Sequence, residues 1–255
     1  MHQKIKKGEL FRSEILLQIV NPNKQLSLNL KGCDGITDVS MLGNVHTLNL
    51  TGCNKITDVS MLGNIHTLYL SNCNQITDVS MLGNVHNLCL IGCGRITDVS
   101  MLRNVDNLRL NRCDGITDVS MLGNVHTLNL HGCHITDVSN LGNVHTLDLS
   151  GCHEIDVSKL GNVHTLCLRH CRGIIGVSML GNVHTLDLFY CKEIVDVSML
   201  GNVHTLILSC CDRITDVSML GNVHTLNLSG CDRITNVSML GNVHILHLPN
   251  CKKIC

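Results

Sequence analysis

The sequence predicts an α/β-type solenoid, an arc of stacked coils with a concave parallel sheet of about twelve short strands. The main observation is a unit of 20 residues, VHTLNLTGCNKITDVSMLGN over 45–64, which recurs along the chain. The chain also has 2 Phe, 2 Tyr and no Trp among 255 residues, so aliphatic side chains must fill its core. One unit cannot bury its own apolar edge, whereas stacked units cover one another.

Each unit is predicted to be a short strand followed by a tight turn. Leu48 and Leu50 alternate with period two, which predicts a strand with both leucines facing inward. Ile56, Val59 and Leu62 are spaced by three, which is typical of a 3₁₀ turn rather than a full helix. The convex side of the arc should therefore consist of 3₁₀ turns.

The ends of that turn carry residues that favour caps and chain reversal. We expect Thr57 or Asp58 to cap its start, because short polar side chains accept backbone N–H groups there. We expect Gly63-Asn64 to end the turn and send the chain back toward the sheet.

A cysteine column marks the register. Twelve cysteines recur at intervals of 20 residues, apart from two intervals of 19: Cys33, Cys53, Cys73, Cys93, Cys113, Cys133, Cys152, Cys171, Cys191, Cys211, Cys231 and Cys251. Stacking makes their side chains parallel, which disfavours disulfides, and no C-x-x-C pair suggests zinc. We expect buried thiols that bond to backbone carbonyls. Cys89 and Cys167, off the column, should face outward and be the more reactive thiols.

The repeat pattern resembles a known family. Over residues 25–251, L-x-x-L-x-L-x-x-C-x-x-I-T-D is similar to the cysteine-containing class of leucine-rich repeats. The short D-V-S-x-L-G-N return looks like the compact repeats of bacterial internalins, and the whole chain resembles leucine-rich-repeat proteins of amoeba-infecting giant viruses. The resemblance implies a scaffold that binds a protein partner on its concave sheet, in the host-cell cytoplasm if the chain is viral.

The two ends differ from the repeat, which suggests domains at 1–24 and 25–255. We expect a helix from Glu9 to Ile19 that caps the first coil, with a partner-binding helix as the alternative. The last unit ends at Cys255, one strand in, so we expect the last coil to lack a capping element. An uncovered end would favour self-association, so a self-assembling structural element is a second candidate function.

Charge and hydropathy exclude several partners. The net charge is -1 and the pI about 6.9, so no basic field is available for nucleic acid. No apolar run is long enough for a membrane span, and Glu9, Arg12 and Glu14 interrupt the stretch that would be a signal peptide. We expect a cytoplasmic protein with reduced thiols and no cofactor.

A histidine column follows the first inward residue of most units. It consists of His46, His66, His86, His126, His145, His164, His184, His204, His224 and His244, and Asp106 takes the place once. The rings should stack at the edge of the sheet and share hydrogen bonds with Thr, or alternatively bridge metal ions. Repulsion between neighbouring imidazolium charges predicts lowered pKa values for these histidines. The stability of the fold should therefore decrease as pH drops through the normal range of histidine titration.

Asp, Ser and His, the ingredients of a catalytic triad, occur in almost every unit. A catalytic site is singular, whereas a group that repeats without variation is scaffolding. The sequence therefore predicts a protein that is not an enzyme.

Specificity should lie where units differ, between the two strand leucines and in the two positions before Cys. The first zone consists of Tyr69, Arg109, Asn111 and Arg112, near the unusual Arg103 and Asp106. The second zone consists of Arg169, His170, Asp187, Phe189, Tyr190 and Ile207. Aromatic residues beside Arg are typical of interface hot spots, so we favour the second zone, with Arg169 stacked on Phe189.

Overall fold

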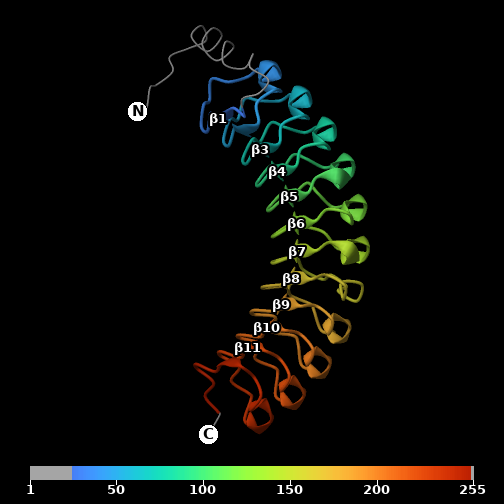
Figure 1. Ribbon diagram of the computed structural model, residues 1–255, viewed down its shortest axis with the longest axis vertical. Helices are drawn as coiled ribbons and strands as arrows, with labels where there is room; N and C mark the ends of the chain where they lie inside the picture. Colours follow the sequence, from blue (N-terminus) through green and yellow to red (C-terminus); the bar gives the residue numbers. More distant parts are fainter. Residues whose placement is uncertain (1–24, 254–255) are drawn as a thin grey trace.

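The computed structural model describes residues 25–253 as one stack of coils that curves into an arc (Figure 1). Short strands line the inner, concave side, and 3₁₀ turns line the outer, convex side. Twelve strands form one parallel sheet in sequence order from β1 to β12, which confirms the predicted solenoid. The helix expected from Glu9 to Ile19 and the terminal Cys255 lie outside the described residues, so the cap and the self-association remain predictions.

All the elements are short. The strands are β1 (Ser27–Asn29), β2 (Thr47–Asn49), β3 (Thr67–Tyr69), β4 (Asn87–Cys89), β5 (Asn107–Arg109), β6 (Thr127–Asn129), β7 (Thr146–Asp148), β8 (Thr165–Cys167), β9 (Thr185–Asp187), β10 (Thr205–Ile207), β11 (Thr225–Asn227) and β12 (Ile245–His247). The 3₁₀ helices are η1 (Ser40–Leu42), η2 (Ser60–Leu62), η3 (Ser80–Leu82), η4 (Ser100–Asn104), η5 (Ser120–Leu122), η6 (Ser139–Asn143), η7 (Ser178–Leu180), η8 (Ser198–Leu200), η9 (Ser218–Leu220) and η10 (Ser238–Leu240).

The core is continuous along the whole stack. Leu48 pairs in register with Leu68, and Leu68 with Leu88, so equivalent side chains lie on top of one another. The inward Leu, Val, Ile and column Cys side chains of each coil form a single apolar cluster from Leu30 to Leu240. Burial of aliphatic surface between successive coils therefore stabilises the fold without aromatic residues.

The start of most 3₁₀ turns is held by a carboxylate. The backbone N–H of Ser60 donates to Asp58 Oδ1 at 2.9 Å, whereas Thr57 is exposed and makes no such bond. Of the two predicted caps, Asp58 is therefore the one that acts. The same bond recurs at equivalent turns, including one where Asn236 replaces Asp.

The glycine at the end of the turn has a different role from the one predicted. Gly63 has a φ of -64°, which any residue adopts, so chain reversal does not require it. A Cβ atom at this position would instead clash with the carbonyl oxygen of Met81 in the next coil. The glycine is explained by the close approach of successive turns, a contact between coils that one unit does not reveal.

Candidate partner-binding surface

The residue just before each column cysteine has a left-handed backbone. Gly fills this position in many coils, for example Gly52 with a φ of 77°. In three successive coils it is occupied instead by His170, Tyr190 and Cys210, with φ values of 57°, 61° and 61°. A left-handed conformation costs a residue with a Cβ atom about 1–2 kcal/mol. Bulky side chains are thus retained here at a conformational cost, as is typical of functional sites.

The aromatic side chains of the second zone contact one another. The ring centroids of His170 and Phe189 are 5.1 Å apart in an edge-to-face arrangement, and those of His170 and Tyr190 are 4.9 Å apart. Lys192 Nζ lies 4.2 Å from the centroid of the Tyr190 ring and 3.3 Å from Asp212 Oδ2. Phe189 is half-buried and Tyr190 is 41% exposed, so the cluster presents an aromatic surface to solvent. The contacts between the rings restrict the rotation of these side chains.

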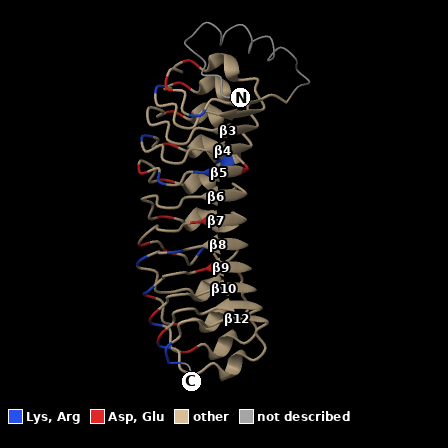
Figure 2. Cartoon of the chain, turned by 90° about the vertical axis from the view of Figure 1, so that its left-hand side faces the viewer, with Lys and Arg blue, Asp and Glu red and all other residues tan. Residues whose placement is uncertain are grey.

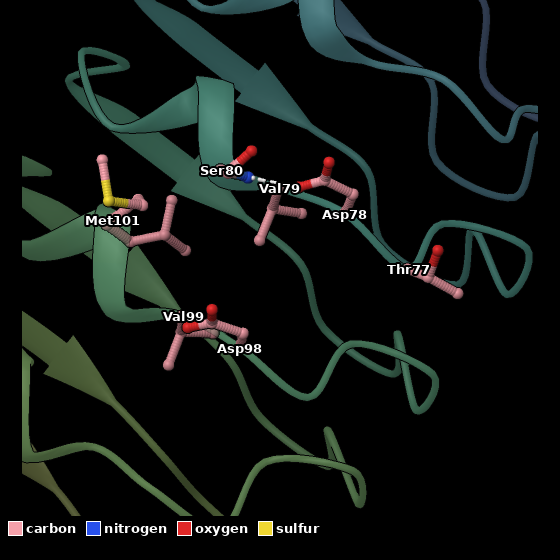
Figure 3. A pocket seen from close by; sticks show the side chains of 8 residues that line it. Thr77, Asp78, Val79, Ser80, Asp98, Val99 and Met101 are labelled. Atoms are coloured by element: carbon pink, nitrogen blue, oxygen red, sulfur yellow. Dashed lines mark hydrogen bonds between the residues drawn. The ribbon is translucent and has the colours of Figure 1, made fainter.

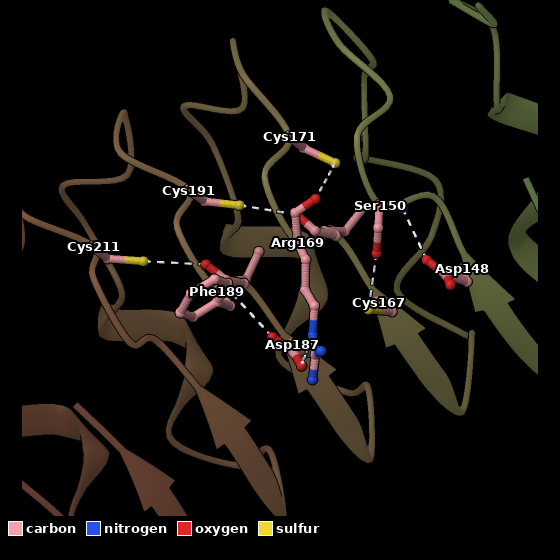
Figure 4. Close-up of polar contacts among 11 residues, drawn as sticks. Asp148, Ser150, Cys167, Arg169, Cys171, Asp187, Phe189, Cys191 and Cys211 are labelled. Carbon is pink, nitrogen blue, oxygen red and sulfur yellow. Dashed lines mark hydrogen bonds and ion pairs between the residues drawn. The ribbon is translucent and has the colours of Figure 1, made fainter. Parts of the chain in front are cut away.

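An ion pair lies beside this aromatic cluster (Figure 4). Arg169 Nε donates to Asp187 Oδ2 at 2.6 Å, and the backbone N–H of Phe189 donates to Asp187 Oδ1 at 3.0 Å. Asp187 is 6% exposed, so both bonds compensate for its desolvation. The predicted stacking of Arg169 on Phe189 is wrong, because the carboxylate offers the guanidinium a stronger, charged acceptor.

The sheet places the rest of the second zone next to this pair. Cys167, Asp187 and Ile207 are register partners on β8, β9 and β10, and Ile207 is half-buried. Figure 2 shows that most charged residues follow one edge of the coils and that few lie on the strands. On this face the carboxylate of Asp187 lies beside the charged Arg169, and Asp148 occupies the equivalent place on β7, where it pairs in register with Cys167.

The predicted reactive thiols are not free outward groups. Cys89 is buried, with its Sγ 3.2 Å from Ser71 Oγ. Cys167 Sγ lies 3.1 Å from Ser150 Oγ, and burial raises the pKa of Cys167. Although alternation does direct both side chains to the concave face, neighbouring side chains cover them. The expectation of outward exposure is therefore wrong for Cys89, whereas Cys167 is only partly buried, and the greater reactivity expected of these two thiols stays a prediction.

The first zone is less concentrated. Tyr69 and Arg109 occupy equivalent places on β3 and β5, with Cys89 between them on β4. Arg112 is exposed on the loop after β5 and has a φ of 55°. In the described part of the chain, no hydrogen bond, ion pair or ring contact joins these three side chains to one another. The structure brings the second zone together and leaves the first dispersed.

The histidine column forms two stacks beside the strands. One contains His46, His66 and His86, and the other runs through seven rings from His126 to His244, with centroid separations of 4.5–4.8 Å in both. Between the stacks, Asp106 Oδ2 lies 3.6 Å from His86 Nε2.

These rings share hydrogen bonds with threonine, as predicted, and their titration is shifted. His66 Nδ1 lies 3.1 Å from Thr67 Oγ1, and similar contacts occur in other coils. Desolvation lowers the pKa of His66, His145 and His204, and repulsion from the neighbouring rings lowers it further. The expected direction therefore holds for these three rings, although desolvation lowers their pKa more than the charge repulsion on which the prediction was based.

The repeated polar residues do not assemble into a triad or a metal site. Asp58 and Ser60 bond to each other at the convex turn, whereas His66 stacks beside the sheet with Thr67. Over residues 25–253, no three His, Cys, Asp or Glu side chains gather in a way that would hold a metal ion. The described residues therefore give no support to the metal-ladder alternative.

Sequence reasoning missed Lys192 and the left-handed position. A signal for the latter was present, because Gly precedes the column cysteine in several units and its replacement by His, Tyr or Cys is conspicuous. Reading that position as left-handed requires the turn geometry, in which the Gly52 N–H donates to Ser71 O of the next coil at 2.8 Å.

Comparison with known proteins places this architecture. No family model matches the sequence, and no curated protein matches it either. An internalin from Listeria monocytogenes superposes with a TM-score of 0.55 at 20% identity, covering 83% of each chain. This chain has a leucine-rich-repeat fold. A leucine-rich-repeat protein from Leptospira interrogans matches 97% of this chain and 88% of its own, with a TM-score of 0.50 and 18% identity.

Two further leucine-rich-repeat structures are informative. The functional domain of InlJ from Listeria monocytogenes, described as including a cysteine ladder, has a TM-score of 0.51 at 20% identity and covers 88% of this chain and 63% of its own. The TLR13–ssRNA13 complex has a TM-score of 0.62 at 22% identity, over 83% of this chain and 37% of the receptor chain. At such identities the likeness concerns the fold alone. Within residues 25–253, no helix is long and apolar enough to cross a membrane.

Proposed function

We propose that this leucine-rich-repeat protein is a non-enzymatic scaffold that binds a protein partner on its concave face, with the second zone at the centre of the contact. The proposal rests on the three successive left-handed positions held by His170, Tyr190 and Cys210. Gly would relieve their backbone cost, so the side chains themselves are expected to contribute something the fold does not need.

The chemistry of the second zone suggests what a partner would contact. The rings of His170, Phe189 and Tyr190 offer an apolar surface to a partner. Because the rings already pack against one another, their side chains lose little conformational entropy when a partner binds. The guanidinium of Arg169 bonds Asp187 only through Nε in the described structure, and its side chain is 54% exposed. Its terminal N–H groups are therefore available to a carboxylate or carbonyl of the partner.

The test uses the left-handed position itself. We would immobilise the wild-type protein, the double variant His170→Gly/Tyr190→Gly and the control Asn72→Gly, which changes the equivalent position of another coil (φ 58°). Each would be incubated with the same cell lysate, and retained proteins would be quantified by mass spectrometry. A genuine partner should be retained by the wild type and the control but lost from the double variant.

Stability separates this result from unfolding. Because Gly relieves the left-handed strain, the double variant should be at least as resistant to urea as the wild type. If all three proteins retain the same partners to the same extent, the second zone is not the contact surface and the proposal fails.

A further inference from the structure

A row of exposed methionines runs along the convex side. One Met lies in each of the first five 3₁₀ helices: Met41, Met61, Met81, Met101 and Met121. These side chains are 46–61% exposed, although the core beneath them is closed. Four more run from Met179 to Met239. A contiguous row of large exposed apolar side chains is typical of an interaction surface, and methionine adapts readily to different partners.

A row of carboxylates runs beside the methionines. Asp58, Asp78 and Asp98 are exposed, and each accepts the backbone N–H of the serine two residues later through Oδ1. That bond lowers the pKa of all three, so they are ionised at neutral pH. The bonds also hold the carboxylates in one orientation, coil after coil. The convex side therefore combines apolar and negatively charged surface in a regular pattern.

Hollows separate successive turns on this face (Figure 3). One hollow of about 200 Å³ has Val79 and Val99 in its lining, with Asp78 and Asp98 beside them and Met101 at one side. Equivalent hollows recur between neighbouring coils. Each would accept the aliphatic stem of a Lys or Arg against Val and Met, with the charged end beside the carboxylates.

The repeat distance suits an α-helix laid along the row. Strands of a sheet are about 4.8 Å apart, and one turn of an α-helix rises about 5.4 Å. The turns spread outward from the concave sheet (Figure 1), so the repeat is longer on the convex side than between the strands. A helix in this direction would present about one side chain to each coil.

From this match of apolar surface, charge and spacing, we propose that the row from Met61 to Met121 binds a cationic amphipathic α-helix of another protein, in which Lys or Arg and apolar residues recur every turn. This surface is separate from the concave second zone and does not depend on its function. Asn140 and Lys159 replace Met in the next two coils, and Gly176 replaces Asp in the coil after them, so the match ends there.

The chain itself supplies conservative test substitutions. Asn occurs naturally at the Met position as Asn140, within η6. Asn also occurs at the Asp position, where Asn236 Oδ1 still accepts the Ser238 N–H at 2.9 Å. The two test proteins are therefore M61N/M81N/M101N and D58N/D78N/D98N, both of which should keep the turn geometry. The control D34N/D114N/E154Q removes the same number of charges from exposed residues of the loop edge.

The probe is a fluorescein-labelled, amidated peptide, LKKLLKLLKKLLKL, with binding followed by fluorescence anisotropy. The wild type should bind it saturably, and both test proteins should bind about tenfold more weakly, because each loses several small exposed contacts. The loop-edge control should stay close to the wild type, and a peptide with Glu for every Lys should not bind. Equal weakening in the loop-edge control, or no saturation of the wild type at about 100 µM, would overturn the proposal. Circular dichroism melting curves would confirm that each variant is folded.

Discussion

The thiol of Cys73 donates a hydrogen bond to the carbonyl oxygen of Leu50 in the preceding coil, with an Sγ–O distance of 3.2 Å. The same carbonyl accepts the backbone N–H of Cys53 at 3.0 Å. Equivalent thiol bonds recur from Cys53 to Cys251. The column therefore links each coil to the one before it through donors small enough to fit inside the core.

Replacing Cys73 by Ala should destabilise the protein by about 1–2 kcal/mol, because a buried hydrogen bond is lost and a small cavity remains. The loss would be measured by urea denaturation. Cys251→Ala is a matched control, because Cys251 makes the same type of bond at a partly exposed site and should cost less. Equal losses at the two sites would show that burial does not govern the contribution of the bond.

The column thiols should resist alkylation in the folded protein. Burial raises the pKa of Cys73 to about 12 and that of Cys93 to about 11, so very little thiolate exists at pH 8. N-ethylmaleimide should label both only after unfolding in urea, whereas the half-buried Cys210 should be labelled earlier. Peptide mass spectrometry at timed intervals would check the order, and rapid labelling of Cys73 in the native protein would contradict it.

Stability should decrease as the histidine stacks are protonated. The pKa values of His66, His145 and His204 are lowered in the folded state, so the unfolded chain binds protons more readily. The resulting contribution to stability is complete above the ordinary pKa of about 6.5 and is lost as pH falls through the lower folded values. The melting temperature should therefore be lower at pH 5.5 than at pH 7.5. His145→Asn should reduce this difference, and equal melting temperatures for the wild type would refute the prediction.

The close approach of successive turns gives a paired mutational test. A Cβ at Gly83 would clash with the carbonyl oxygen of Met101, whereas a Cβ at Gly241 would meet no atom within 4 Å. Gly83→Ala should destabilise by about 1–2 kcal/mol, while Gly241→Ala should be neutral or slightly stabilising. Arg103 occupies the equivalent place in one coil, so a side chain can be accommodated at this position. Urea denaturation of both variants would detect the difference, and equal effects would exclude the clash as the cause.

The aspects predicted correctly are those that one unit repeats. Once coils stack, only one orientation of the unit buries all of its apolar side chains. These are the alternating Leu48 and Leu50, the spaced Ile56 and Val59, and the column cysteine. The strands, the 3₁₀ turns and the buried thiols follow from that pattern. The second zone was singled out because it departs from an otherwise constant unit, and its role in binding stays a proposal.

The failed predictions concern contacts between coils. Arg169 bonds Asp187 of the next coil rather than stacking on Phe189, and Ser71 covers Cys89 from the preceding coil. The period of the sequence predicts which residues share a column. It does not predict which neighbouring side chain will accept a hydrogen bond or bury a thiol.

The sequence by itself determined the stacked coil, its register and its aliphatic core, because apolar periodicity leaves only one way to bury those side chains. The tertiary structure alone decided the left-handed turn before each column cysteine, the ion pair of the second zone and the carboxylate-lined hollows of the convex face. These features depend on the distance and direction between adjacent coils, which arise when the backbones of successive units pack and bond to one another.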